Sequence, residues 1–113
     1  MAGLLHKEVI STDKAPPPLP VFSQAIKCGG MICTLALPRA QALRNLSAVL
    51  EAAGSSLDNA VKVNVFLTTM ENFAAMNKVY ETFFKAPRPC RTCVAVKELP
   101  LHTDVEIECI AHQ

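Results

Sequence analysis

The stretch that most constrains the fold is the alternating segment VKVNVFLT at residues 61–68. Successive side chains of a β-strand point to opposite faces, so residues two apart share a face. One face is then purely apolar, with Val61, Val63, Val65 and Leu67, and the other carries Lys62, Asn64, Phe66 and Thr68. Such a strand needs a covering layer on its apolar side.

Two segments with helical spacing flank this strand and can supply that layer. Leucines recur at three- and four-residue intervals from Leu43 to Leu50, which predicts a helix over 39–53 that ends at Gly54. A second stripe predicts a helix over 70–84, with a cap at Thr68 or Thr69. That second stripe consists of Phe73, Met76, Tyr80 and Phe83.

The remaining apolar segments read as strands. They cover residues 5–12, 22–28, 31–37, 91–97 and 105–112, and Gly29-Gly30 can form the tight turn of a hairpin. The order of strands, helix, strand, helix and two strands indicates an α+β fold, with one mixed sheet and two helices on one face. We expect a single domain over residues 1–113.

The face of the sheet away from the helices is predicted to be chemically mixed. If the apolar set of each strand faces the helices, the other face carries Asn64, Phe66, Arg91, Cys93, Ala95, Glu106, Glu108 and Ile110. Two helices cover only one side, so we expect this face to meet another subunit, where an arginine and carboxylates could form a ligand pocket. The alternative is a structural ion pair of Arg91 with Glu106 or Glu108.

The CxxC in PCRTC (residues 89–93) is not expected to be a metal or redox site. In a strand, Cys90 and Cys93 point to opposite faces and lie ~10 Å apart, beyond the ~7 Å reach of a disulfide. A zinc site needs a second suitably spaced pair, and the three histidines are scattered. No phosphate-binding glycine motif occurs either, so we expect no metal and no cofactor.

The composition of the chain indicates which binding partners and which cell compartment to expect. The chain of 113 residues has a formal net charge of +1, which does not favour nucleic acid or an anionic membrane. No apolar run is long enough to span a membrane. Five cysteines without framework spacing indicate reduced thiols. We expect a cytoplasmic protein; a mitochondrial location stays open, although the N-terminus is no clear transit peptide.

Three segments resemble one family. PCRTCVAVKELP followed by VEIECIA is similar to the C-terminal signature of the RidA/YjgF family of reactive intermediate imine deaminases. FSQAIKCGG resembles an early segment of that family, and residues 45–84 resemble its middle. The resemblance implies a chorismate-mutase-like α+β fold in a homotrimer with clefts between subunits. It also implies cofactor-independent hydrolysis of 2-enamine and 2-imine acids, such as 2-iminobutanoate and 2-iminopropanoate, to 2-oxo acids and ammonia.

The resemblance also implies roles for individual residues. Arg91 corresponds to the arginine that grips the substrate carboxylate, and Glu106 to the glutamate that helps place the attacking water. Asn77, Cys93 and Phe22 correspond to residues that line the cleft, Phe22 standing where the family has a tyrosine. A planar guanidinium suits the first role, because it offers two parallel donors to a carboxylate.

One departure from the family pattern concerns the second hairpin. The family continues this hairpin with a Ser-Gly pair and a further strand before the first helix, whereas ICTLALPRAQALRNL runs directly from strand to helix. We therefore expect a missing segment near residues 34–39. Two alternatives stay open: a non-catalytic member that binds small carboxylates or a protein partner, and a translation-inhibiting ribonuclease.

Overall fold

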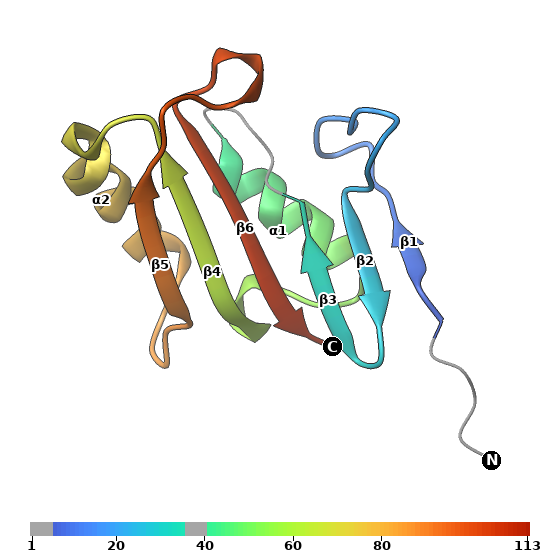
Figure 1. Cartoon of the computed structure of the whole chain (residues 1–113). Coiled ribbons are helices and arrows are strands. Elements are labelled where there is room, and N and C mark those ends of the chain that lie inside the picture. The colour runs from blue at the N-terminus through green and yellow to red at the C-terminus, as the bar shows by residue number, and fades with distance from the viewer. Residues whose placement is uncertain (1–5, 36–40) are drawn as a thin grey trace.

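The structure, a computed structural model, describes residues 6–35 and 41–113. Within these residues it contains a six-stranded mixed sheet and two α-helices (Figure 1). The strands are β1 (Glu8–Ile10), β2 (Ala25–Cys28), β3 (Met31–Thr34), β4 (Ala60–Leu67), β5 (Cys90–Ala95) and β6 (Val105–His112), and the helices are α1 (Ala42–Ala52) and α2 (Phe73–Phe83). The sheet order is β1-β2-β3-β6-β4-β5, in which only β4 and β5 run parallel.

The predicted order of strands and helices is confirmed, and so are the predicted cap at Thr69 and the helix end at Gly54. The Thr69 hydroxyl accepts a hydrogen bond from the Glu71 N–H at 3.2 Å and caps the short 3-10 turn that leads into α2. Gly54 follows α1 with a φ of +80°, a conformation that glycine adopts without strain. The predicted end of strand 31–37 and start of helix 39–53 fall on residues 36–40, which lie outside the described residues.

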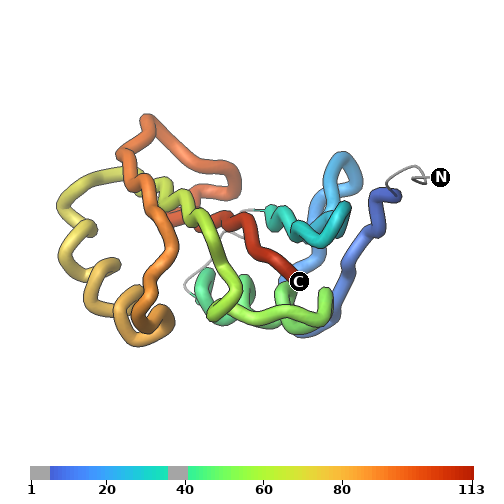
Figure 2. Tube along the Cα trace, turned by 90° about the horizontal axis from the view of Figure 1, so that it is seen from below, coloured from blue at the N-terminus to red at the C-terminus, as the bar shows by residue number. Residues whose placement is uncertain are grey.

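Both helices belong to one layer, but they cover different parts of the sheet. Figures 1 and 2 show α1 against β3 and β6, and α2 near the edge formed by β5. The core lies between this layer and the sheet, where several apolar side chains have no exposed surface: Ile32, Leu46, Val49, Leu50, Val63 and Val65. Burial of this kind contributes about 1.5–3 kcal/mol for each large aliphatic side chain.

The pairing register shows which residues face the helices. Residues directly opposite each other on neighbouring strands point to the same face. Val63, Val65 and Leu67 of β4 lie opposite Cys109, Ile107 and Val105 of β6, and all but the last are buried. The prediction that Val61 joins this face is wrong: the register shifts between Ala60 and Lys62, and Val61 is 49% exposed.

Two buried polar side chains, Gln24 and Thr34, hydrogen-bond to backbone groups where the regular strand pairing ends. Gln24 accepts a hydrogen bond from the Thr12 N–H at 2.7 Å and donates to the Pro16 carbonyl at 2.9 Å, which fixes the proline-rich loop between β1 and β2. At the end of β3, the Thr34 hydroxyl accepts from the Cys109 N–H at 2.8 Å and donates to the Cys109 carbonyl at 3.2 Å. These bonds satisfy backbone groups that would otherwise be buried without partners.

The lengths of the two helices bear on any membrane role. Among the described residues, neither helix is long and apolar enough to cross a membrane.

Candidate functional site

Arg91 occupies an unusual position on the edge strand β5. Its guanidinium carbon lies 4.7 Å from the ring centroid of Tyr80 and 5.6 Å from that of Phe73, and Nη1 lies 4.0 Å from the Met76 sulfur. All three neighbours lie on α2, so the side chain of Arg91 reaches beneath this helix. Its contacts within the described residues include no carboxylate, so its strong hydrogen-bond donors stay available for an anion.

The side of the sheet on which Arg91 lies contradicts one prediction. Arg91 pairs with Val63, whose side chain is fully buried under the helices. Glu106 and Glu108 pair with Phe66 and Asn64 on the opposite face. The prediction that Arg91 shares a face with these carboxylates is therefore wrong, and so is the alternative of an Arg91–glutamate ion pair within one chain.

The helix above Arg91 contributes two polar groups without partners. The Asn77 side-chain oxygen and the Tyr80 hydroxyl oxygen are buried and have no hydrogen-bond partner among the described residues. The two residues are one turn apart on α2, so they share a helix face. Burial raises the pKa of Tyr80, an effect that the nearby positive charge of Arg91 partly opposes. The phenol therefore stays protonated at neutral pH.

Asn77 was predicted as a site residue, but Tyr80 was not. Its place in the apolar stripe of the second helix led to its assignment as a core residue. The available sequence signal was that Asn77 and Tyr80 are three residues apart, which puts an amide and a phenol on the same face of a helix. Buried polar side chains normally have a partner, so two unpaired oxygens on one helix face single out this region as a candidate site.

The two cysteines beside Arg91 point to opposite faces, as predicted. Cys90 pairs with Lys62 and is exposed, whereas Cys93 pairs with Val65 on the same side as Arg91. Both thiols are free. Burial raises the pKa of Cys93, and Arg91 only partly offsets this effect. Cys93 is therefore a neutral thiol near pH 7 and a poor nucleophile.

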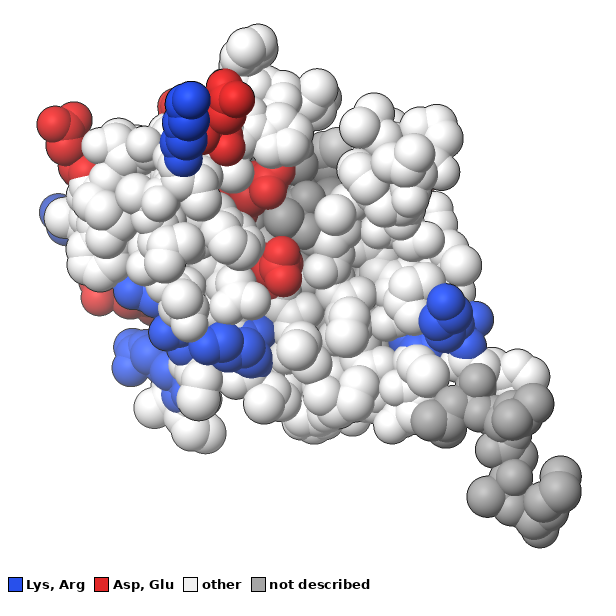
Figure 3. All heavy atoms as spheres, viewed as in Figure 1, with Lys and Arg blue, Asp and Glu red and all other residues white. Residues whose placement is uncertain are grey.

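Glu106 lies on the face of the sheet that no helix covers, which we call the open face. Burial among its neighbours raises the pKa of Glu106, and the negative charge of Glu108 raises it further. Asn64 donates a hydrogen bond of 3.5 Å to Glu108. Figure 3 looks onto this face and shows acidic side chains near its middle and basic ones toward the start of β4 and β5.

Phe22 lies far from Arg91 within the chain. It is 42% exposed in the loop before β2, and β3, β6 and β4 separate β2 from β5. Four strand-to-strand steps amount to ~19 Å. A single chain therefore groups Arg91, Asn77 and Cys93 around α2, and it leaves Phe22 and Glu106 elsewhere.

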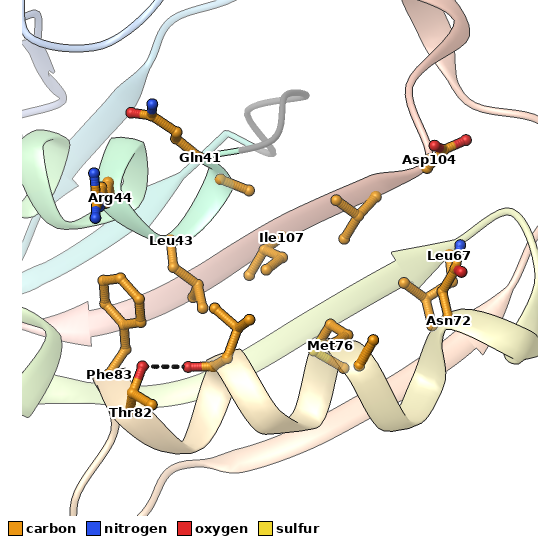
Figure 4. A pocket seen from close by; sticks show the side chains of 14 residues that line it. Gln41, Leu43, Arg44, Leu67, Asn72, Met76, Thr82, Phe83, Asp104 and Ile107 are labelled. Carbon is orange, nitrogen blue, oxygen red and sulfur yellow. Dashed lines mark hydrogen bonds between the residues drawn. The ribbon is translucent and has the colours of Figure 1, made fainter.

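A cavity lies between α2 and α1 (Figure 4). This cavity of about 660 Å³ has a largely apolar wall and floor: Ala42, Leu43, Leu67, Ala75, Met76, Val79, Phe83, Val105 and Ile107. Gln41, Arg44, Asn72, Thr82 and Asp104 supply its polar lining. None of the predicted site residues lines it, and neither of the two unpaired buried oxygens belongs to it.

Among the described residues, no group of three or more His, Cys, Asp or Glu residues is close enough to hold a metal ion.

Comparison with known proteins places this geometry in a family. The family model described as Endoribonuclease L-PSP matches residues 12–113. The mitochondrial protein mmf1 of Schizosaccharomyces pombe is 44% identical over 128 residues, covering 95% of this chain and 79% of the relative. A 2-iminobutanoate/2-iminopropanoate deaminase of Dermatophagoides farinae is 36% identical over 121 residues, covering 92% of this chain and 94% of the relative.

A solved structure supports the same placement. The crystal structure of E. coli TdcF with bound serine aligns with a TM-score of 0.87 and 32% sequence identity, over 95% of this chain and 99% of the other. The predicted fold of a mixed sheet with two helices is thereby confirmed for the chain.

The lengths of these alignments bear on the predicted missing segment. The alignment with mmf1 runs over 128 positions, yet 95% of the 113-residue chain is only about 107 residues. Roughly twenty positions of the relative therefore have no counterpart here. This difference agrees with a segment lost from the family pattern; its predicted place near residues 34–39 lies mostly outside the described residues.

Proposed function

Because the chain belongs to the Rid family, which comprises the RidA/YjgF and L-PSP proteins, we propose that it hydrolyses 2-enamine and 2-imine acids to 2-oxo acids and ammonia without a cofactor. The substrate class includes 2-iminobutanoate and 2-iminopropanoate, which the name of the 36% identical relative specifies. Arg91 is the residue on which this proposal depends.

The observation that supports the proposal most is that the Arg91 guanidinium contacts aromatic rings and has no carboxylate partner among the described residues. A partly buried arginine without a counter-ion is costly unless an anion can bind to it. The carboxylate of a 2-imino acid has the required charge and shape, because it can accept two parallel N–H bonds.

The proposed reaction requires little chemistry from the protein. A water oxygen bonds to the imine carbon and one water proton passes to the nitrogen, which gives a carbinolamine. The second water proton then moves from the new hydroxyl to the nitrogen as the C–N bond breaks, ammonia leaves, and the carbon becomes the carbonyl of a 2-oxo acid. Holding the carboxylate fixes the imine carbon in one place, so that positioning supplies most of the rate enhancement.

A homotrimer is part of the proposal. Arg91 and Glu106 face opposite sides of one sheet, and Phe22 lies at the far end of the strand order. A site that uses all three residues must therefore combine parts of more than one copy of the chain. Apolar side chains on the open face, among them Val94 (41% exposed) and Ile110 (37% exposed), suit such an interface. Light scattering at micromolar concentration tests this directly, and a monomer would contradict it.

The activity can be tested in a coupled assay. A threonine dehydratase releases the imine of 2-oxobutanoate, and we expect the protein to accelerate formation of 2-oxobutanoate over buffer. Arg91→Ala should remove most of the acceleration, whereas Arg88→Ala, which removes an exposed arginine just before β5, should leave it in place. A rate equal to that in buffer, under conditions in which a full-length relative works, would contradict the proposal.

A second candidate function follows from the same geometry. Since Glu106 and Glu108 lie on the face of the sheet opposite Arg91, the site could bind small carboxylates without turning them over. The relative TdcF was crystallised with serine bound, which makes serine a suitable probe. Saturable binding of serine or 2-oxobutanoate in calorimetry, without imine hydrolysis, would favour this function over the deaminase.

Two expectations from the sequence stay predictions. The cytoplasmic location is one, and the mitochondrial relative makes the mitochondrion the alternative to test by fractionation. The absence of nucleic-acid binding is the other. The formal net charge of +1 supports it, and salt-dependent retention on an RNA column would contradict it.

A further inference from the structure

Tyr80 forms the centre of a stack that ends at Arg91. Its ring lies 4.4 Å from the ring of Phe84, at an interplanar angle of 27°, and 4.7 Å from the guanidinium carbon of Arg91. Tyr80 and Phe84 are 6% and 2% exposed, so both rings are held in place by the surrounding packing. The order Phe84, Tyr80, Arg91 therefore leads from the fixed core to a side chain that is only half buried.

This arrangement limits where the guanidinium can be. A free arginine side chain samples many rotamers, and fixing it costs about 1.5–2 kcal/mol of conformational free energy. A cation within ~6 Å of an aromatic centroid is attracted by the negative face of the ring. Tyr80 and Phe73 both meet this limit, and Tyr80 is the closer of the two.

The attraction leaves the chemistry of Arg91 intact. A contact between the cation and a ring uses none of the five N–H donors, whereas an ion pair with a glutamate would occupy two of them. Fixing this arginine with an aromatic ring thus holds the side chain in one place while its donors stay open for a ligand.

We propose that Tyr80 is a positioning residue of the site: its ring, supported by Phe84, holds the Arg91 guanidinium in the orientation that receives the substrate carboxylate. This inference rests on the proposed function of Arg91 and adds a residue to it. The ring carries the role, and the hydroxyl does not act as a proton donor in the reaction. The raised pKa of Tyr80 agrees with a phenol that stays protonated throughout the physiological range.

Three substitutions separate the ring from the hydroxyl. In the coupled imine assay, Tyr80→Leu should raise KM about three- to tenfold, as expected for a lost cation–ring contact, with a smaller change in kcat. Tyr80→Phe keeps the ring and should leave KM within about twofold of the wild-type value. Val79→Ala is the matched control on α2, because Val79 lies on the cavity side of the helix and should leave KM unchanged.

A fluorinated ring tests the same inference without altering the packing. Replacing Tyr80 by phenylalanine and then by pentafluorophenylalanine weakens the negative face of the ring at nearly constant shape. KM should rise several-fold with fluorination while the melting temperature of the protein changes little. A purely structural role of Tyr80 would give unchanged KM values, and a proton-donor role would make Tyr80→Phe as impaired as Tyr80→Leu; either result would overturn the inference.

One measurement remains valid even if the deaminase activity fails. The heteronuclear NOE of the Arg91 Nε–H reports the order of this side chain on the nanosecond timescale without any substrate. We expect a rigid signal in the wild-type protein and in Tyr80→Phe, and a mobile one in Tyr80→Leu. Equal order in all three would sink the role of Tyr80. An inactive wild-type protein with the expected NOE pattern would sink only the proposed reaction.

Discussion

The two faces of the sheet are built from the same strands and differ in almost every property. On the helix face, Val63 and Val65 are fully buried, and Ile107 is 3% exposed. One residue further along the same strands, the open face carries Phe66 and two glutamates. Arg91 nevertheless belongs to the covered face. A charge expected at the surface thus lies beneath a helix, while the uncovered face exposes apolar side chains such as Val94 and Ile110.

The largest expected effect tests the charge on the covered face. Arg91→Ala removes both donors to the substrate carboxylate and should lower kcat/KM about a hundredfold. Arg91→Lys keeps the positive charge but not the paired donors, and we expect it to recover only part of the loss. Steady-state kinetics in the coupled assay measure both variants. Equal activity of wild type and Arg91→Ala would show that the covered face does not hold the site.

The next largest effect is on stability, and it compares a substitution on the helix face with one on the open face. Val65→Ala removes fully buried methyl groups and should lower the free energy of unfolding by about 2 kcal/mol. Thr92→Ala changes a neighbouring residue on the open face and should cost less than about 0.5 kcal/mol. Urea titrations at one protein concentration give both values. Similar losses for the two variants would contradict the assignment of the faces.

Much of this contrast between the two faces could be predicted from the sequence. The predictions that failed have a common cause. Alternation shows which residues of a strand share a face: Arg91 and Cys93, two residues apart, pair with Val63 and Val65 on the same side. It does not show which face is covered. In β5, placing Arg91, Cys93 and Ala95 on the open face turned Val94 toward the helices. Val94 is nevertheless 41% exposed, because β5 is an edge strand and α2 presents aromatic rings that accommodate a cation.

The position of Tyr80 illustrates a second limit. Helical periodicity places Tyr80 in the buried stripe, which is correct, since it is 6% exposed. Periodicity cannot reveal that the ring lies over a guanidinium from a strand ten residues later. Such a contact depends on the parallel pairing of β4 and β5, which is a long-range property of the fold. The register shift that takes Val61 off the helix face also depends on strand pairing, and periodicity cannot predict it either.

A third, smaller effect uses the thiols as probes of the two faces. Cys90 is exposed on the open side of β5, whereas Cys93 is partly buried and has a raised pKa. In variants that retain one of the two, Cys90 should react with iodoacetamide about tenfold faster or more, because the reagent needs both access and thiolate. Mass spectrometry over a time course gives the rates.

The same labelling can sharpen the comparison by showing whether another copy covers the open face. Cys33 pairs with Ile110 on that face and is exposed in the single chain. In an assembly through this face, the labelling of Cys33 should slow as the protein concentration rises above the dissociation constant. A rate for Cys33 that is independent of concentration, together with a single-chain mass, would mean that the open face stays uncovered.

The smallest expected effect concerns the carboxylates of the open face. Burial, and then the charge of Glu108, raises the pKa of Glu106 above its value in the unfolded chain. The folded protein therefore binds a proton at Glu106 at a pH where the unfolded chain does not. The stability contribution of Glu106 is consequently lowest at neutral pH and rises as the pH falls through the raised pKa toward about 4.5.

Glu106→Gln should remove this dependence. We expect the variant to melt at a slightly higher temperature than the wild-type protein at pH 7.5, with the difference shrinking at pH 5 because the wild-type carboxyl is then increasingly neutral. Glu98→Gln, an exposed residue outside the sheet, is the control and should give equal differences at both values. A Glu106→Gln variant that is less stable at pH 7.5 would instead mean that its charge is matched by a partner on the open face. Arg91 of the same chain is not that partner, because it lies on the other side of the sheet.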